Sequence, residues 1–222
     1  MDLAALLRDT DRDAWRTLHS HWDWGWTPSP QASQRAPIAV PVDLVEFHAT
    51  VGRTVQNSLR SLAGLQVEDD GFVTICDEAQ GAFEWALREA ETGNEDPPVW
   101  GRGSETDALW TLQSPTLSIF LVQTLIIDAT TIGLSEIGFW GDGTADAVQR
   151  LLAPMERLPW PSWTWVAESG FYAGDDTLAW VTGEHSDWPL VHVAGRTVAA
   201  LEPFHIADPD PFRVLGKGES VP

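Results

Sequence analysis

The stretch TLSIFLVQTLIIDAT, residues 116–130, constrains the fold more than any other segment because it is apolar on nearly every side. Ser114 and Pro115 precede it: serine can cap the first helical amides, and proline fits the first helical position. The sequence therefore predicts a helix that opens at this pair. A helix that is apolar all round is buried, so we expect it at the centre of the core. Its apolar residues are Leu117, Ile119, Phe120, Leu121, Val122, Leu125 and Ile126.

Short strands are expected before this helix. The turn signal DDG at 69–71 leads into FVTIC, and a second strand with Trp85 follows the stretch EAQG. Pro97 and Pro98 hold the chain extended, which predicts a short or edge strand at residues 99–100. Another short strand is expected at residues 109–112.

Five segments have apolar residues at helical spacing. They are residues 2–8, residues 15–22, PVDLVEFHATVG, RTVQNSLRSLAG (residues 53–64) and residues 144–152. Gly52 is expected to end the third of these helices and Pro154 the last. In the last of these we expect Ala145, Val148, Leu151 and Leu152 to point inward. The segments SWTWV, GFYAG, TLAWVTG and PLVHVAG then read as short strands between turns. The sequence predicts an α+β protein with a mixed sheet and packed helices in residues 1–133. Residues 134–222 are expected to add a C-terminal helix and a small antiparallel sheet as an extension or subdomain.

Charge limits the possible partners. With 13 basic and 33 acidic residues the formal charge is −20, so the chain would repel nucleic-acid backbones. It would attract a basic protein, although the same composition can serve solubility alone. No apolar run is long enough to span a membrane and the N-terminus has no basic signal region, which together favour the cytoplasm. The single cysteine, Cys76, lies in an apolar run and is expected to be a buried thiol.

Patterns that carry chemistry are missing from the sequence. His19 and His21 are two residues apart and point to different faces of a helix, and the other histidines are scattered, so no metal site is expected. There is no nucleophile elbow, phosphate-binding loop or dinucleotide fingerprint. Acidic residues beside tryptophans are typical of glycosidase clefts, but a chain with so many acidic residues has such neighbours by chance. We expect no enzymatic activity and no cofactor.

Four motifs follow one another between residue 41 and about residue 130. They are PVDLVEFHATVG, the Glu-x-Gln-Gly turn with its aromatic strand in EAQGAFEWAL, DPPVW, and the serine-opened helix SPTLSIFLVQTL. In order and spacing this set resembles the SUKH superfamily. The resemblance covers less than half of the chain. It does not extend to the first 40 residues or to any residue after Gly133.

The resemblance implies a non-enzymatic binding fold. Bacterial members are largely immunity proteins, which neutralise polymorphic toxins, often nucleases or nucleic-acid deaminases, by direct binding. The acidic charge agrees with such a basic partner. The alternatives are an intracellular scaffold or regulatory module without a toxin partner, and a carbohydrate-active protein. The candidate contact residues surround the EAQG turn and the DPPVW loop: Glu78, Gln80, Glu84, Glu95, Asp96, Trp100 and Glu105. For each, a solvated acid or a packing tryptophan is the competing interpretation.

Overall fold

A computed structural model describes residues 2–8, 12–22, 35–52, 57–105, 108–131, 136–140, 145–164, 168–186, 189–207 and 213–215. The chain forms two compact units: unit 1 comprises Met1–Gly25 and Leu125–Pro222, and unit 2 comprises Trp26–Thr124. These units do not coincide with the expected ranges 1–133 and 134–222, since the N-terminal helices group with the C-terminal part. Within the described ranges, no helix combines the length and apolarity needed to cross a membrane.

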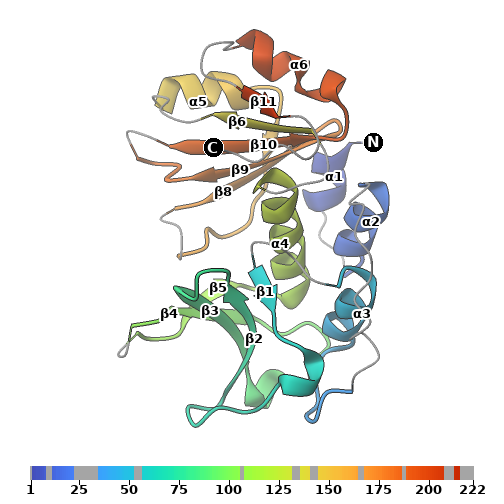
Figure 1. The fold of residues 1–222 in the computed structure, drawn as a ribbon, viewed down its shortest axis with the longest axis vertical. Helices are drawn as coiled ribbons and strands as arrows, with labels where there is room; N and C mark the ends of the chain where they lie inside the picture. The colour runs from blue at the N-terminus through green and yellow to red at the C-terminus, as the bar shows by residue number, and fades with distance from the viewer. Residues whose placement is uncertain are drawn as a thin grey trace. The chain divides into compact units, whose positions relative to one another are not determined.

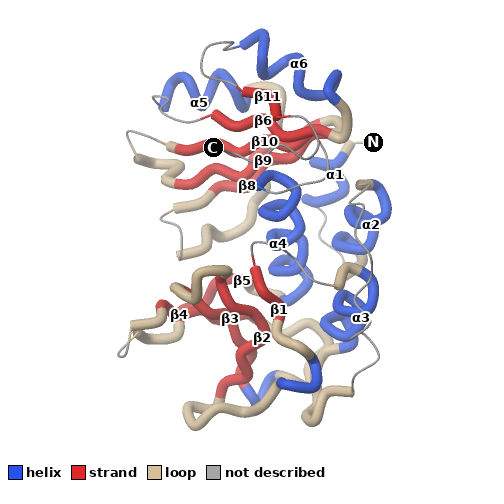
Figure 2. Tube along the Cα trace, in the orientation of Figure 1, coloured by secondary structure: helices blue, strands red, loops and turns tan. Residues whose placement is uncertain are grey.

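Unit 2 is built on a five-stranded antiparallel sheet in which the strands follow one another in chain order (Figures 1 and 2). Its strands are β1 (Asn57–Leu59), β2 (Phe72–Glu78), β3 (Phe83–Arg88), β4 (Val99–Gly103) and β5 (Thr111–Ser114). The predicted strands in this region are confirmed. Strand β4 is short, which is one of the two expected forms, and it lies between β3 and β5, so it is not an edge strand.

Helix α3 (Val42–Thr50) confirms the predicted helix before Gly52, which has a φ of +72°. That left-handed conformation suits glycine and ends the helix. The helix predicted for residues 53–64 is wrong where the structure describes this segment. Residues Asn57–Leu59 pair with β2 as β1, and Leu62–Gly64 form a single 3-10 turn. Pairing with a neighbouring strand overrides the local apolar spacing here.

The apolar helix is confirmed as α4 (Leu117–Thr131), and it is buried along almost its whole length. Its cap differs from the prediction. Ser114 ends β5 and its hydroxyl donates to the Thr116 carbonyl at 2.8 Å. The Thr116 Oγ1 accepts the Ile119 amide at 3.3 Å, and Asp96 accepts the Ser118 amide at 2.8 Å. A loop aspartate distant in sequence therefore caps the helix.

Unit 1 contains a six-stranded antiparallel sheet in the order β11-β6-β10-β9-β8-β7 (Figure 1). The strands β8 (Gly170–Gly174), β9 (Thr177–Thr182) and β10 (Leu190–Gly195) confirm three predictions. Ser162 and Trp163 are not in a strand, so the SWTWV prediction is wrong for them, and Trp165 and Val166 lie outside the described residues. The elements that were not predicted are β6 (Glu136–Trp140), β7 (Glu156–Arg157), α6 (Val198–Ala207) and β11 (Arg213–Leu215).

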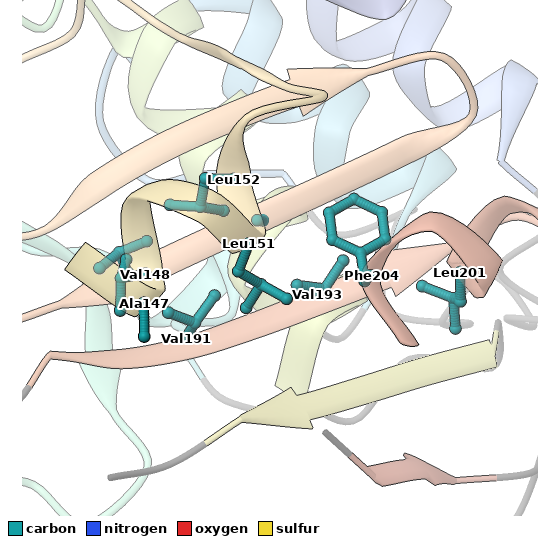
Figure 3. Close-up of a cluster of buried hydrophobic side chains, with 10 residues drawn as sticks. Ala147, Val148, Leu151, Leu152, Val191, Val193, Leu201 and Phe204 are labelled. Atoms are coloured by element: carbon teal, nitrogen blue, oxygen red, sulfur yellow. The ribbon is translucent and has the colours of Figure 1, made fainter. Parts of the chain in front are cut away.

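Three helices of unit 1 were predicted: α1 (Leu3–Arg8), α2 (Ala14–His21) and α5 (Ala145–Leu152). Figure 3 shows α5 and α6 placing apolar side chains over the sheet, where they form a buried cluster with Val191 and Val193. Val148, Leu151 and Leu152 point inward as predicted. Ala145 is exposed, and Ala147 takes the inward position instead.

The α+β class is confirmed, with a C-terminal helix and antiparallel sheet after residue 133. The expectation of a mixed sheet is wrong for the described strands, because every pair among them is antiparallel.

Candidate partner-binding surface

The Glu-x-Gln-Gly motif forms the turn between β2 and β3. The Glu78 carboxylate accepts the backbone amides of Gln80 at 2.8 Å and Ala82 at 3.2 Å. Gly81 has a φ of +73°, a conformation that costs other residues energy. Glu78 is buried, so this candidate holds the turn rather than presenting a charge to solvent.

The side chains of strand β3 point alternately to the two faces of the sheet, a core face and an outer face. Trp85 is fully buried on the core face, where its ring lies 6.0 Å from Phe120 of α4 and 5.1 Å from Phe83. This confirms Trp85 as a core anchor against the helix. Glu84 points to the other side, opposite Arg102 of β4. We call that side of the five-stranded sheet the outer face; it carries Phe72, Thr74, Asp77, Glu84, Arg88, Trp100 and Arg102.

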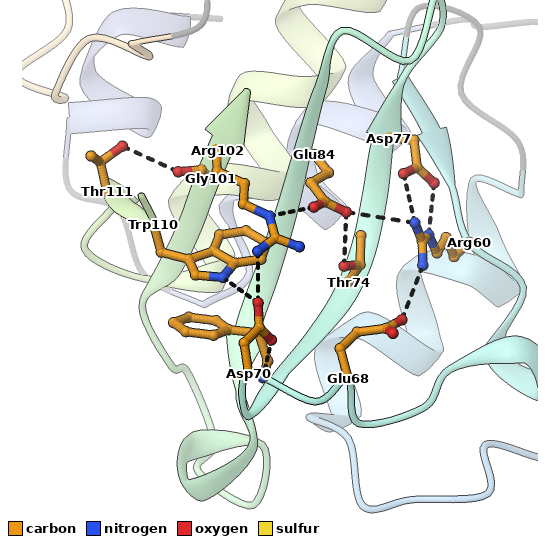
Figure 4. Close-up of polar contacts among 11 residues, drawn as sticks. Arg60, Glu68, Asp70, Thr74, Asp77, Glu84, Gly101, Arg102, Trp110 and Thr111 are labelled. Atoms are coloured by element: carbon orange, nitrogen blue, oxygen red, sulfur yellow. Dashed lines mark hydrogen bonds and ion pairs between the residues drawn. The ribbon is translucent and has the colours of Figure 1, made fainter. Parts of the chain in front are cut away.

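Arg60 anchors one half of an ion-pair network on the outer face (Figure 4). Its guanidinium donates two hydrogen bonds to Asp77, at 2.7 and 2.9 Å, and lies 3.6 Å from both Glu68 and Glu84. The hydrogen bond to Asp77 raises the pKa of Arg60 further above its ordinary value, against the opposing effect of burial. The Arg60 guanidinium is therefore charged at every physiological pH.

Arg102 forms the other half of the network. It donates to Glu84 at 2.6 Å and to Asp70 at 2.7 Å, and its guanidinium lies 4.2 Å from the centre of the Trp110 ring. The Trp110 indole also donates to Asp70 at 3.0 Å. Burial would raise the pKa of Asp70, but the hydrogen bonds from Trp110, Phe72 and Arg102 together lower it. Glu84 connects the halves and also accepts the Thr74 hydroxyl at 3.1 Å.

Aromatic rings continue this surface. Phe72 stacks on Trp110 at 4.5 Å and meets Trp100 edge-on at 6.3 Å, while Arg88 lies 3.7 Å above the Trp100 ring. Tryptophan and arginine dominate the energetic centres of protein interfaces. The candidate Trp100 thus belongs to a half-exposed aromatic and arginine surface.

The seven candidate residues do not form one cluster. One end of the sheet, where β2 turns into β3, holds Glu78 and Gln80. The Ser104 amide donates to the Ala82 carbonyl at 3.0 Å, which brings Glu105 to the same end. Glu95 and Asp96 lie on the connection at the opposite end, after β3. A strand of six residues spans about 17 Å, so one small contact would not cover both ends. Asp96 is also engaged as the cap of α4.

Exposed carboxylates gather at the end of the sheet that holds Glu95. The turn before β2 brings Asp69 and Asp70 beside Glu89, whose amide bonds to the Gly71 carbonyl at 2.9 Å. Glu95 is exposed on the same β3–β4 connection. We call Asp69, Asp70, Glu89 and Glu95 the acidic end. Only Glu95 of these was a candidate from the sequence.

Unit 1 holds a separate polar cluster beside a pocket of about 320 Å³ under α5. Arg157 donates to both oxygens of Glu184, at 2.7 and 2.8 Å, and the Tyr172 hydroxyl donates to the same carboxylate. Burial would raise the pKa of Glu184, but these hydrogen bonds lower it, while burial and the carboxylate raise the pKa of Tyr172. The groups satisfy one another, which indicates a structural role.

The histidines and the cysteine do not form a metal site in the described part of the chain, where no three ligating side chains converge. His21 lies 2.9 Å from Asp176, and His192 stacks on Trp180. Cys76 is fully buried, as predicted.

Sequence reasoning missed the network itself, namely Arg60, Glu68, Asp70, Thr74, Asp77, Arg102 and Trp110. One signal was present: Glu84 and Arg102 each alternate with core residues or glycines, which places them on one face of their strands. Strand register determines which residues of neighbouring strands face each other, and the register cannot be read from the spacing of residues along the chain.

Comparison of the chain with models of protein families, with curated proteins and with solved structures finds no match. The resemblance to the SUKH superfamily therefore rests on the four motifs alone.

Proposed function

We propose that this chain is a non-enzymatic immunity protein, which neutralises a basic bacterial toxin in the cytoplasm by binding it directly. The toxin class that suits the charge is a nuclease or nucleic-acid deaminase, because such enzymes present basic surfaces to phosphate backbones. An acidic protein can occupy that surface in place of the nucleic acid.

The observation that carries this proposal is the acidic end of unit 2. Asp69, Glu89 and Glu95 are exposed there, within a chain of net charge −20. Deeper in the outer face, Asp77 and Glu84 form ion pairs with Arg60 and Arg102. Exposed rim charges accelerate encounter with an oppositely charged protein, and this acceleration falls with salt.

The test uses the toxin-like protein encoded next to the gene for this chain. We expect a complex in a binding assay, and protection of cells when both proteins are produced together. The double variant Glu89→Gln/Glu95→Gln should bind roughly tenfold more weakly, chiefly through slower association at low salt. The matched control Asp146→Asn/Glu202→Gln removes the same charge from exposed sites on α5 and α6 and should bind like the wild type.

A lack of both complex and protection would refute the immunity function. In that case an intracellular scaffold or regulatory module without a toxin partner becomes the better account. Equal loss of binding in the two double variants would mean that overall charge acts without a specific acidic end.

A further inference from the structure

The outer face of unit 2 carries apolar side chains next to the acidic end. Leu112 of β5 is 50% exposed, and its neighbour across the sheet is the half-buried Trp100 of β4. Trp110 precedes Leu112 by two residues and therefore lies on the same side of the chain. We call Phe72, Trp100, Trp110 and Leu112 the apolar patch. The face of an antiparallel sheet that is turned to water normally carries polar side chains, so this patch is a candidate contact surface.

Contacts among the rings hold the apolar patch in one arrangement. Phe72 stacks on Trp110 at 4.5 Å, and the Arg88 guanidinium lies 3.7 Å from the centre of the Trp100 ring. A hydrogen bond from its indole nitrogen to Asp70 also holds Trp110 in place. A surface that is ordered before binding loses less conformational entropy when a partner docks on it. Ordered tryptophans are typical of the residues that supply most of the energy of an interface.

Charge indicates which partner would cover the patch. Asp70 belongs to the acidic end and accepts the Trp110 indole N–H at 3.0 Å, so the acidic end and the patch are continuous (Figure 4). The acidic end and the outer face with its network together hold seven carboxylates and three arginines: Glu68, Asp69, Asp70, Asp77, Glu84, Glu89 and Glu95, with Arg60, Arg88 and Arg102. This negative balance around an apolar centre complements a basic protein and disfavours a second copy of this acidic chain.

We infer that the apolar patch is the centre of the interface with the basic toxin and that the acidic end is part of its rim. The inference rests on the proposed function and adds where the binding energy arises. Protein interfaces commonly have an apolar centre inside a polar rim. Charges at the rim act mainly on the rate of association, whereas contacts at the centre act mainly on the rate of dissociation. The toxin surface that fits is an apolar patch bordered by lysine or arginine.

Binding kinetics with the toxin-like protein encoded next to the gene test this division. Leu112→Ser removes apolar contact area without changing the charge, so the complex should dissociate about tenfold faster with little change in association. Salt should not alter this loss, in contrast to that of Glu89→Gln/Glu95→Gln. The matched control Val198→Ser changes a valine on α6 that is 55% exposed, and it should bind like the wild type. Circular dichroism verifies folding, and Leu112→Gln replaces the serine variant if that one unfolds.

A cysteine variant tests the location of the interface. Leu112→Cys introduces a thiol into the apolar patch, and Val198→Cys introduces one on α6. Because the natural Cys76 is fully buried, an alkylating reagent should modify only the introduced thiol of the folded protein. Saturating toxin should slow the alkylation of Leu112→Cys by at least about tenfold, since the centre of an interface excludes water, and leave that of Val198→Cys unchanged.

The possible failures of the two proposals are distinguishable. If the wild type forms a complex but Leu112→Ser dissociates no faster than Val198→Ser, the apolar patch is not the centre of the interface. Failure of the toxin to protect the thiol of Leu112→Cys would overturn the inference in the same way. In both cases the proposed function stands. If the wild type forms no complex with the toxin, the proposed function and this inference are refuted together.

Discussion

The two units each combine arginine, carboxylate and aromatic side chains, and they differ in how far water reaches the carboxylates. In unit 2, Arg60 and Asp77 meet on an open sheet face, where the Asp77 side chain is 33% exposed. In unit 1, Arg157 and Tyr172 surround Glu184, whose side chain is only 8% exposed. An exposed ion pair contributes little net stability, whereas removing support from a buried one leaves an uncompensated charge.

The difference assigns different roles to the two clusters. The ion pairs of the unit 2 network are open to water, which suits a surface next to the proposed binding site. The cluster of unit 1 is closed on itself and joins β7 and β8 to Glu184, two residues after β9. We therefore expect changes in unit 1 to act on stability, and changes on the surface of unit 2 to act mainly on association.

The largest expected effect comes from one partly buried histidine in each unit. Burial lowers the pKa of His48 in unit 2 and of His192 in unit 1 to about 4, from an ordinary value of 6.5. Between these values the unfolded chain binds protons that the folded chain does not, so stability falls as the pH is lowered. The loss should be on the order of 3 kcal/mol for each histidine.

Chemical denaturation at pH 7 and pH 4.5 measures this loss. His192→Phe retains a ring to stack on Trp180 and cannot titrate, so it should lose less stability on acidification than the wild type. His48→Gln is the counterpart in unit 2 and should behave in the same way. If both variants lose as much stability as the wild type, burial of these imidazoles is not the cause.

The next effect concerns the closed cluster of unit 1. A Cβ atom at Gly170 would lie 2.7 Å from the Glu184 carboxylate, which Arg157 and Tyr172 hold in place. Gly170→Ala should therefore lower the free energy of unfolding by about 2 kcal/mol. Gly93→Ala in unit 2 is the control, since a Cβ there meets nothing within 4 Å. A thermal unfolding comparison decides this, and equal midpoints for the two variants would contradict the close fit.

Sequence reasoning succeeded where one local pattern determines the structure. The helix α4 follows from an apolar run that no strand of ordinary length could accommodate, and the Glu78 turn follows from a glycine that adopts a positive φ. Burial of Trp85 follows from its alternation with Glu84 along β3. Each of these depends on neighbours in the chain.

Sequence reasoning failed where contacts between residues distant in the chain determine the structure. Residues 57–59 have helical spacing but pair with β2, and the cap of α4 comes from Asp96 instead of the adjacent Ser114. The outer-face network required the register between β3 and β4, which places Glu84 opposite Arg102. The partner-binding candidates were chosen by nearness in sequence, and the sheet separates them to opposite ends.

The smallest expected effect concerns the open network of unit 2. Asp77→Asn removes the charge that receives both hydrogen bonds from Arg60, yet Glu68 and Glu84 remain 3.6 Å from that guanidinium. The variant should lose less than about 1 kcal/mol, and less still in about 1 M salt than in about 0.1 M, because salt screens exposed pairs. Urea denaturation at both salt concentrations measures this, with Asp69→Asn as a control of equal charge at an exposed turn. If the loss in the free energy of unfolding is as large as that of Gly170→Ala, or if salt does not reduce it, the unit 2 network behaves like the closed cluster of unit 1. The surface would then be a rigid structural element, since exchange of its ion pairs with a partner requires that each pair be weak.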